Sequence, residues 1–160
     1  MSTAIILLLV AALVGAAIVG GVFFAFSSFI MKALARVPSP EGIRAMQSIN
    51  ITVINRSFLG TFFATALSSI VLGWIAVVAW PSPFAMYVVA GAALYLFGTF
   101  AVTIFANVPL NNQLADTNPT DGEATAVWMS YLDRWTTLNT IRTVAALLAV
   151  LMYTLGLMQT

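Results

Sequence analysis

The sequence predicts an all-α fold, a transmembrane four-helix bundle with an extramembrane helical extension formed by the connections between spans one and two and between spans three and four. All Asp, Glu, Lys and Arg residues fall in two stretches, 32–56 and 116–142. The rest is long apolar runs, and about 20 apolar residues cross a bilayer core of about 30 Å. With 61% hydrophobic and 7% charged residues and a mean hydropathy of +1.02, the composition lies outside that of ordinary soluble domains.

Four segments are long and apolar enough to cross the membrane as helices. With approximate bounds, they are residues 4–30, 57–80, 84–106 and 139–158. Because these spans leave no room for a second domain, we expect a single domain over residues 1–160. The first span has no basic start and exceeds the apolar core of a signal peptide, so we expect it to be retained.

All six cations are predicted on one side of the bundle. They are Lys32, Arg36, Arg44, Arg56, Arg134 and Arg142. An even number of spans places both termini on the opposite side. The positive-inside rule then predicts a multi-pass protein of the cell's inner membrane, with charged loops 31–56 and 107–138 cytoplasmic and both termini external.

The first two spans carry rows of small residues, which let helices approach closely in lipid. In the first span they are Ala12, Ala16 and Gly20, flanked by Ala17, Gly21 and Ala25. In the second span they are Thr61, Thr65, Ser69 and Gly73. The hydroxyls of the second row can also bond back to their own helix. These rows predict a packed helical bundle.

The first connection predicts a helix that begins near residue 40. Ser39 can cap it, Pro40 suits its first position, and Glu41 favours its positive end. A stripe of amide and hydroxyl side chains follows, and we expect it to face the mouth of the bundle. The stripe consists of Gln47, Asn50, Ser57 and Thr61.

The third span is expected to end in the segment 107–114, because Pro109 biases the residue before it away from helical geometry. If the helix resumes after the proline, Asn107 and Asn111 would still be neighbours. The polar linker that follows has the composition of a loop. Thr120 or Asp121 can cap a last helix, which we expect to restart near residue 122.

The last helix carries the sharpest pattern in the chain, five residues at steps of three, four, four and three that share one face. They are Trp128, Tyr131, Trp135, Asn139 and Arg142. One interpretation is an interfacial aromatic belt with the arginine reaching to the headgroups. The other is a pocket, because a guanidinium inside the span costs several kcal/mol unless it finds partners.

Side-chain amides are suitable neutral partners for that guanidinium, and six are predicted near the same membrane edge. They are Asn50, Asn55, Asn107, Asn111, Asn112 and Asn139. The hypothesis is therefore a pocket of Asn and Arg side chains, capped by Trp and Tyr.

The chain has no Cys and no His, which removes thiolates, imidazole bases and most metal ligands. The five carboxylates occupy loop or helix-end positions, where solvated charge is the expected role. They are Glu41, Asp116, Asp121, Glu123 and Asp133. We expect no metal, no cofactor and no nucleic-acid partner. The predicted partner is the lipid bilayer, and the sequence sets no oligomeric state.

Five groups of residues carry a resemblance to a known family. They are 23–27, 31–34, 45–50, 107–114, and the spaced set Trp128, Tyr131, Trp135, Asn139 and Arg142. In this order, and over nearly the whole chain, they resemble the anthrone oxygenase-like membrane family, also called domain of unknown function 1772. The resemblance implies an integral membrane four-helix protein whose fungal relatives oxidise anthrones to anthraquinones without a metal or a flavin.

An anthrone-like or quinol-type substrate would lose a proton made acidic by its carbonyl, and the anion would react with dioxygen. Such a hydrophobic aromatic molecule needs oxyanion donors and stacking rings. We expect catalytic roles for Asn139, Arg142, Tyr131 and Asn50. We expect substrate-binding roles for Trp128, Trp135, Asn55, Asn107, Asn111 and Asn112.

The proton acceptor is open among Tyr131, Asp133 and bulk hydroxide. A non-catalytic membrane scaffold, or a lipid- or ligand-binding module, explains the same residues with less chemistry. Transport is not favoured, because no charge interrupts a span at mid-membrane and no inverted repeat is evident.

Overall fold

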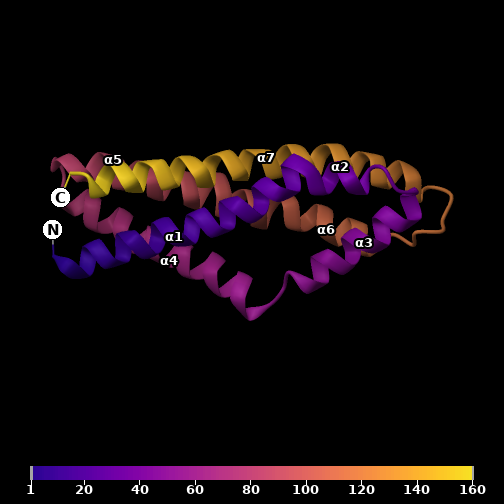
Figure 1. The fold of residues 1–160 in the computed structure, drawn as a ribbon, viewed down its shortest axis with the longest axis horizontal. Coiled ribbons are helices and arrows are strands. Elements are labelled where there is room, and N and C mark those ends of the chain that lie inside the picture. The colour runs from indigo at the N-terminus through magenta and orange to yellow at the C-terminus, as the bar shows by residue number, and fades with distance from the viewer. Residues whose placement is uncertain (1, 160) are drawn as a thin grey trace.

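A computed structural model describes residues 2–159, and every regular element in that range is a helix. Four continuous helical runs are long and apolar enough to cross a membrane, Thr3–Leu34, Arg56–Val78, Pro83–Ala115 and Ala124–Leu157. They lie along the long axis of the molecule, with both ends of the chain at one end of the bundle (Figure 1). The predicted all-α bundle with four membrane-spanning helices is confirmed.

The runs are built from α-helical segments, some joined through π-helical turns. The first run comprises α1 (Thr3–Ala25), η1 (Phe26–Ile30) and α2 (Met31–Leu34), and α3 (Ser39–Thr52) follows it. The second run is α4 (Arg56–Val78). The third comprises α5 (Pro83–Ala93), η2 (Leu94–Ala101), η3 (Thr103–Asn107) and α6 (Val108–Ala115). The fourth is α7 (Ala124–Leu157).

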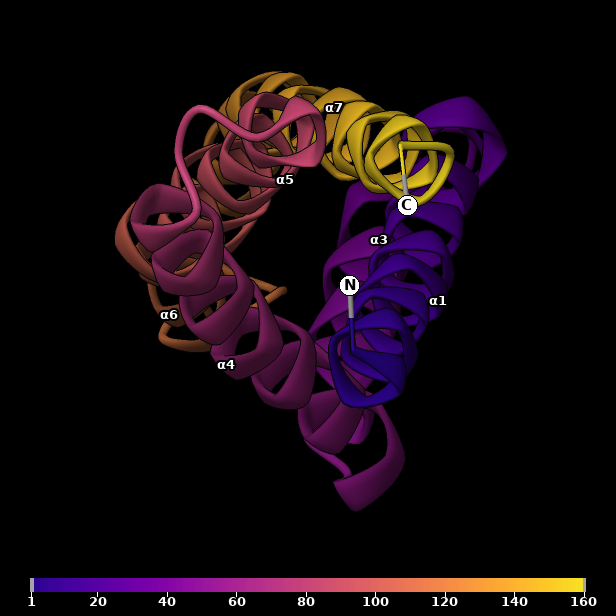
Figure 2. The same ribbon diagram turned by 90° about the vertical axis from the view of Figure 1, so that its left-hand side faces the viewer.

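The four runs surround a central core. Seen from the end that holds the termini, α1 packs against α4 and α7, and α5 closes the ring between α4 and α7 (Figure 2). Apolar residues of these helices fill the interior, among them Leu9, Phe62 and Tyr153. The outer surface is also apolar, with side chains such as Trp74 and Phe97 exposed. An apolar exterior around an apolar core is typical of a bilayer-embedded bundle.

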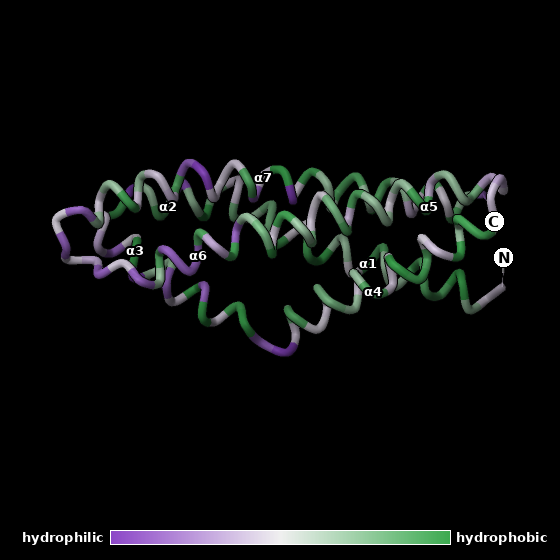
Figure 3. Tube along the Cα trace, turned by 180° about the vertical axis from the view of Figure 1, so that it is seen from behind, coloured by the Kyte–Doolittle hydropathy of each residue, from purple (hydrophilic) through white to green (hydrophobic). Residues whose placement is uncertain are grey.

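Three of the runs extend beyond the membrane. They contain 32, 33 and 34 residues, which at 1.5 Å per residue makes each about 50 Å long against a bilayer core of about 30 Å. Their projecting ends and α3 form the predicted extension, where α3 packs against α6 and α7 around a second apolar cluster. Hydrophilic segments gather at this end of the molecule, away from the termini (Figure 3).

The third run does not end at the amide segment, so that expectation was wrong. The helix continues through Pro109 to Ala115. The π-turn η3 comes directly before it, and the Val108 N–H there bonds to the Thr103 carbonyl. Because the wider π-turn already departs from the α pattern, the proline ring and its missing N–H are accommodated without a break.

The helices that follow the two connections begin close to the predicted residues 40 and 122, at Ser39 and Ala124, but the predicted side-chain caps and the continuous polar stripe were wrong. Ser39 is the first residue of α3 and makes no capping bond. α7 begins at Ala124 without a side-chain cap, since Asn118 Oδ1 instead accepts from the Thr120 N–H and hydroxyl. The stripe from Gln47 to Thr61 is divided by the break between α3 and α4, because Asn55 Oδ1 accepts from the Phe58 N–H and starts a new helix.

The small-residue rows lie at helix contacts. Ala12, Ala16 and Gly20 are buried, whereas Gly21 is exposed. A Cβ at Gly20 would lie 3.1 Å from the Ala146 Cβ of α7, so glycine permits the close approach of the two helices. Thr65 and Ser69 in the second row donate to carbonyls four residues earlier, at 2.7 and 2.8 Å, as the sequence suggested.

Replacing Gly20 by Leu should therefore lower the thermal unfolding midpoint of the detergent-solubilised protein, because overpacking the contact with α7 costs about 1–3 kcal/mol. Gly21→Leu is the matched control, since no atom lies within 4 Å of a Cβ built there. Equal midpoints for the two variants would contradict the packing described.

Candidate functional site

Arg142 is a buried cation held by neutral groups. It lies on α7, is 5% exposed, and directs Nε and Nη2 to Asn139 Oδ1 at 2.9 and 2.8 Å. Its Nη1 makes a longer bond of 3.4 Å to Thr103 Oγ1. The guanidinium carbon lies 3.8 Å from the ring centre of Phe23 and 4.9 Å from that of Trp135. Amide, hydroxyl and π faces thus replace the water that burial removed.

Asn139 fixes this arrangement to the first run. Its Nδ2 donates to the Phe23 carbonyl at 2.7 Å and to Ser27 Oγ at 2.6 Å. These acceptors flank the start of η1, where backbone bonding changes from α to π and a carbonyl becomes available to a side chain. Both functional ends of the Asn139 amide are therefore used, which sets its orientation and that of Arg142.

The third run presents a polar row toward α7, at steps of four residues. It consists of Thr99, Thr103, Asn107 and Asn111. Thr99 Oγ1 donates to the Arg142 carbonyl at 3.1 Å, and Asn107 Nδ2 donates to the Trp135 carbonyl at 3.2 Å. A step of four residues is longer than an α turn, which has 3.6 residues, and shorter than a π turn. A run that combines both kinds of turn, as this one does through η2 and η3, therefore keeps the four side chains on one face.

The aromatic stripe of α7 is buried against protein. Trp128, Tyr131 and Trp135 stack in sequence, with ring centres 5.7 and 5.9 Å apart. Trp128 packs over Gly42 of α3, where a Cβ would come within 2.8 Å of its ring. An interfacial belt would expose these rings to lipid, so the belt interpretation does not describe them.

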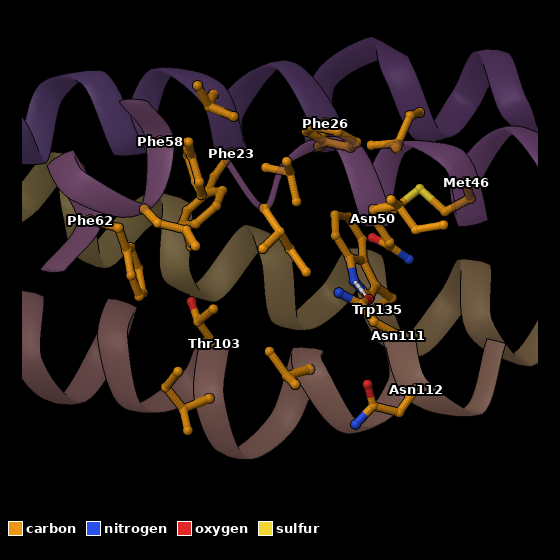
Figure 4. A pocket seen from close by; sticks show the side chains of 18 of the residues that line it. Phe23, Phe26, Met46, Asn50, Phe58, Phe62, Thr103, Asn111, Asn112 and Trp135 are labelled. Carbon is orange, nitrogen blue, oxygen red and sulfur yellow. Dashed lines mark hydrogen bonds between the residues drawn. The ribbon is translucent and has the colours of Figure 1, made fainter. Parts of the chain in front are cut away.

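Asn111 has an amide orientation set by its neighbours. Its Oδ1 accepts from Trp135 Nε1 at 2.7 Å and from the Tyr131 hydroxyl at 2.9 Å. Because an indole nitrogen only donates, the oxygen must face Trp135, and the NH₂ group points the other way. Figure 4 shows this amide nitrogen directed toward the cavity, and among residues 2–159 it has no hydrogen-bond partner.

A cavity of about 440 Å³ lies beside these groups, within the range of small-molecule sites. Most of its wall is apolar, from residues that include Phe23, Phe26, Phe58 and Phe62 (Figure 4). Its polar groups are Gln47, Asn50, Thr103, Asn111, Asn112 and Arg142. No Asp or Glu is among the described residues that line it.

The structure brings most of the predicted residues together. Those on the cavity wall are Asn50, Asn111, Asn112, Trp135 and Arg142. Those one contact behind it are Tyr131, Asn139 and Asn107, and Trp128 stacks on Tyr131. Asn50 joins the group through its Nδ2, 3.4 Å from the Tyr131 hydroxyl.

Two predicted residues lie apart from the cavity. Asn55 is exposed and caps α4, so its amide has a structural role. Asp133 is exposed on α7 and is not part of the wall. Sequence reasoning missed Thr99, Thr103 and Ser27. The four-residue spacing of Thr99 and Thr103 ahead of Asn107 and Asn111 was the available signal for two of them.

Asn139→Ala should destabilise the protein, because it leaves Arg142 and the Phe23 carbonyl without their amide partner, a loss of about 1–3 kcal/mol per buried group. The thermal unfolding midpoint of the solubilised protein measures this. Asn112→Ala is the control, since its side chain is exposed and has no hydrogen-bond partner among the described residues. A midpoint for Asn139→Ala no lower than that of Asn112→Ala would be evidence against the role assigned to this amide.

Comparison with protein families provides a match over most of the chain. The family model described as anthrone oxygenase matches residues 51–152. Comparison with curated proteins and with solved structures finds no significant match. The matched region contains α4 to α6 and α7 as far as residue 152, including Asn111, Trp135, Asn139 and Arg142. The chain belongs to the anthrone oxygenase family.

Proposed function

We propose that this protein is a cofactor-independent oxygenase that binds a flat, hydrophobic, anthrone-like or quinol-type molecule in the cavity and oxidises it with dioxygen. The observation that carries the proposal is Arg142, a buried guanidinium on the cavity wall whose side-chain hydrogen bonds all go to neutral groups. A cation in such surroundings favours a ligand that carries or develops negative charge. Family membership supplies the class of substrate.

The reaction balances for anthrone itself. Anthrone loses a proton from the carbon opposite its carbonyl, which leaves an anion with its charge on the carbonyl oxygen. This anion passes electrons to dioxygen, and a carbon–oxygen bond forms at the same carbon to give a hydroperoxide. Loss of the second hydrogen and cleavage of the oxygen–oxygen bond release water, so anthrone and O₂ yield anthraquinone and H₂O.

The polar groups of the cavity wall would stabilise the anion. Arg142 Nη1 makes only the long bond to Thr103, and the Asn111 amide nitrogen makes none to protein, so both can donate to a substrate oxygen. Because neighbouring residues already orient these donors, little reorganisation is needed as charge develops. The phenylalanines of the wall and Trp135 would hold the flat ring system.

No carboxylate of the described residues is placed to accept the proton. Asp133 is exposed and lies off the wall, and no described carboxylate lines the cavity. We therefore assign the proton to water or hydroxide at the amide edge formed by Gln47, Asn50 and Asn112. The same lack of a carboxylate favours the second candidate, a module that binds such a ligand without turning it over.

We also propose how this single domain lies in the membrane. The extension carries Lys32, Arg36 and Arg44, so the positive-inside rule assigns it to the cytoplasm and assigns both termini to the opposite face of the inner membrane.

Oxygen uptake by the purified protein with anthrone, in the presence of a metal chelator, tests the function. Arg142→Met should reduce the rate by at least about 100-fold, the usual effect of removing one oxyanion donor. Met keeps an apolar contact with Phe23 but leaves Asn139 Oδ1 without its donors, so the thermal unfolding midpoint of the variant is measured first and the rates are compared only for folded protein. Arg134→Gln changes an exposed arginine of the same helix and should retain the wild-type rate.

Three results would count against the oxygenase. One is no uptake by wild-type protein across anthrones and related phenols, combined with measurable ligand binding, which favours the binding module. Another is uptake that disappears with chelator. The third is equal uptake by wild type and a folded Arg142→Met variant.

A topology reporter tests the orientation. Alkaline phosphatase, which is active only outside the cytoplasm, should be active when fused after the last residue and inactive when inserted in the linker between α6 and α7. The reverse pattern would overturn the proposed sidedness.

A further inference from the structure

We infer that the cavity opens sideways into the bilayer, and that its ligand is a lipid-soluble molecule that enters from the hydrocarbon phase. The inference rests on the proposed use of this cavity as the ligand site. It adds the route of entry and the physical class of the ligand, which must partition into membranes and place a single oxygenated end against Arg142 and Asn111.

Exposed wall residues mark where the cavity opens. On one side they are Ile51, Ile54 and Phe63, which are 74%, 69% and 51% exposed. On the other side Val108, Asn112 and Ala115 follow one face of α6. The mouth therefore lies between the α3–α4 corner and the third helical run.

The helix packing agrees with this position. α4 packs against α1, α5 and η2, while α3 packs against α6 and α7. Residues 53–55 interrupt the helix between α3 and α4, and the start of α4 lies at a corner that stands out from the rest of the bundle (Figure 1). The first turns of α4 therefore diverge from η3 and α6 on the side where the exposed wall residues gather.

The mouth crosses the edge of the membrane. Ile51 and Ile54 come before Arg56 and lie on the extension side, whereas the part of the mouth at Phe63 lies in hydrocarbon. α4 begins at Arg56, a cation expected at the edge of the hydrocarbon layer. Phe63 lies seven residues further along the helix, which is about 10 Å deeper. Ile104, on the opposite wall, belongs to an apolar helical run that crosses the membrane.

The chemistry of the rim points to lipid as its solvent. Its exposed residues are mainly apolar, and a continuous apolar opening of this kind is costly in water. Asn112 is a polar residue of the mouth, on its α6 side, whereas Arg142 is 5% exposed and lies further in. A membrane-dissolved ring can therefore slide in between Phe63 and Ile104 while its oxygen advances toward the donors.

Spin-label accessibility in the absence of any ligand tests the inference without depending on catalysis. The natural chain has no cysteine, so single-cysteine variants of the full-length protein need no other change. Thr103→Cys reports from inside the cavity, and Phe63→Cys and Ile104→Cys report from the two sides of the mouth. Phe97→Cys, 73% exposed on η2, is the lipid reference, and Thr125→Cys, exposed near the start of α7, is the aqueous reference.

Each labelled protein, in lipid nanodiscs, is exposed to oxygen, which concentrates in lipid, and to a water-soluble nickel chelate. At the three cavity positions the ratio of oxygen to nickel accessibility should shift away from the Thr125 value to match that of Phe97. If Thr103→Cys does not fold, Phe63→Cys and Ile104→Cys still decide the question. A ratio matching Thr125 would show an aqueous mouth, and loss of both accessibilities would show a sealed cavity. Either result would overturn the inference.

Discussion

The burial of Arg142 without a carboxylate constrains the rest of the site. A guanidinium inside a span must have its donors satisfied, and in this protein one amide oxygen, on Asn139, takes two of them. That amide is in turn anchored to the first run beside η1, and Thr103 reaches the arginine from η3. Three of the four spans are therefore tied to one cation, and the backbones of the first and third runs depart from the α pattern near it.

The extension completes the site from outside the bilayer. Its apolar cluster packs α3 against the aromatic rings of α7, which places Asn50 beside Tyr131 and Tyr131 beside Asn111. The Tyr131 hydroxyl accepts a hydrogen bond from Asn50 Nδ2 and donates one to Asn111 Oδ1. Because the Asn111 oxygen is used in this way, the nitrogen of the same amide is left facing the cavity. A site with this arrangement depends on a folded extramembrane part as well as on the membrane bundle.

Periodicity and charge placement predicted much of this arrangement. The spans followed from the two charged stretches, and the common face of Trp128 to Arg142 followed from steps of three and four in one helix. The interruptions of regular geometry were not predicted. Pro109 was expected to end a helix that instead continues, because sequence rules describe α-helices and do not anticipate π-turns. Asn55 was grouped with the other amides by its position along the chain, but its side chain caps α4 and does not line the cavity.

The unequal lengths of the spans give α4 a distinct relation to the membrane. At 23 residues it is about 35 Å long, close to the hydrophobic thickness of a bilayer, whereas the other three runs project well beyond it. Hydrophobic mismatch therefore acts differently on the wall that α4 provides than on the wall formed by its longer neighbours. Membranes of different acyl-chain length would tilt or displace one side of the cavity relative to the other, which makes lipid composition a determinant of its width.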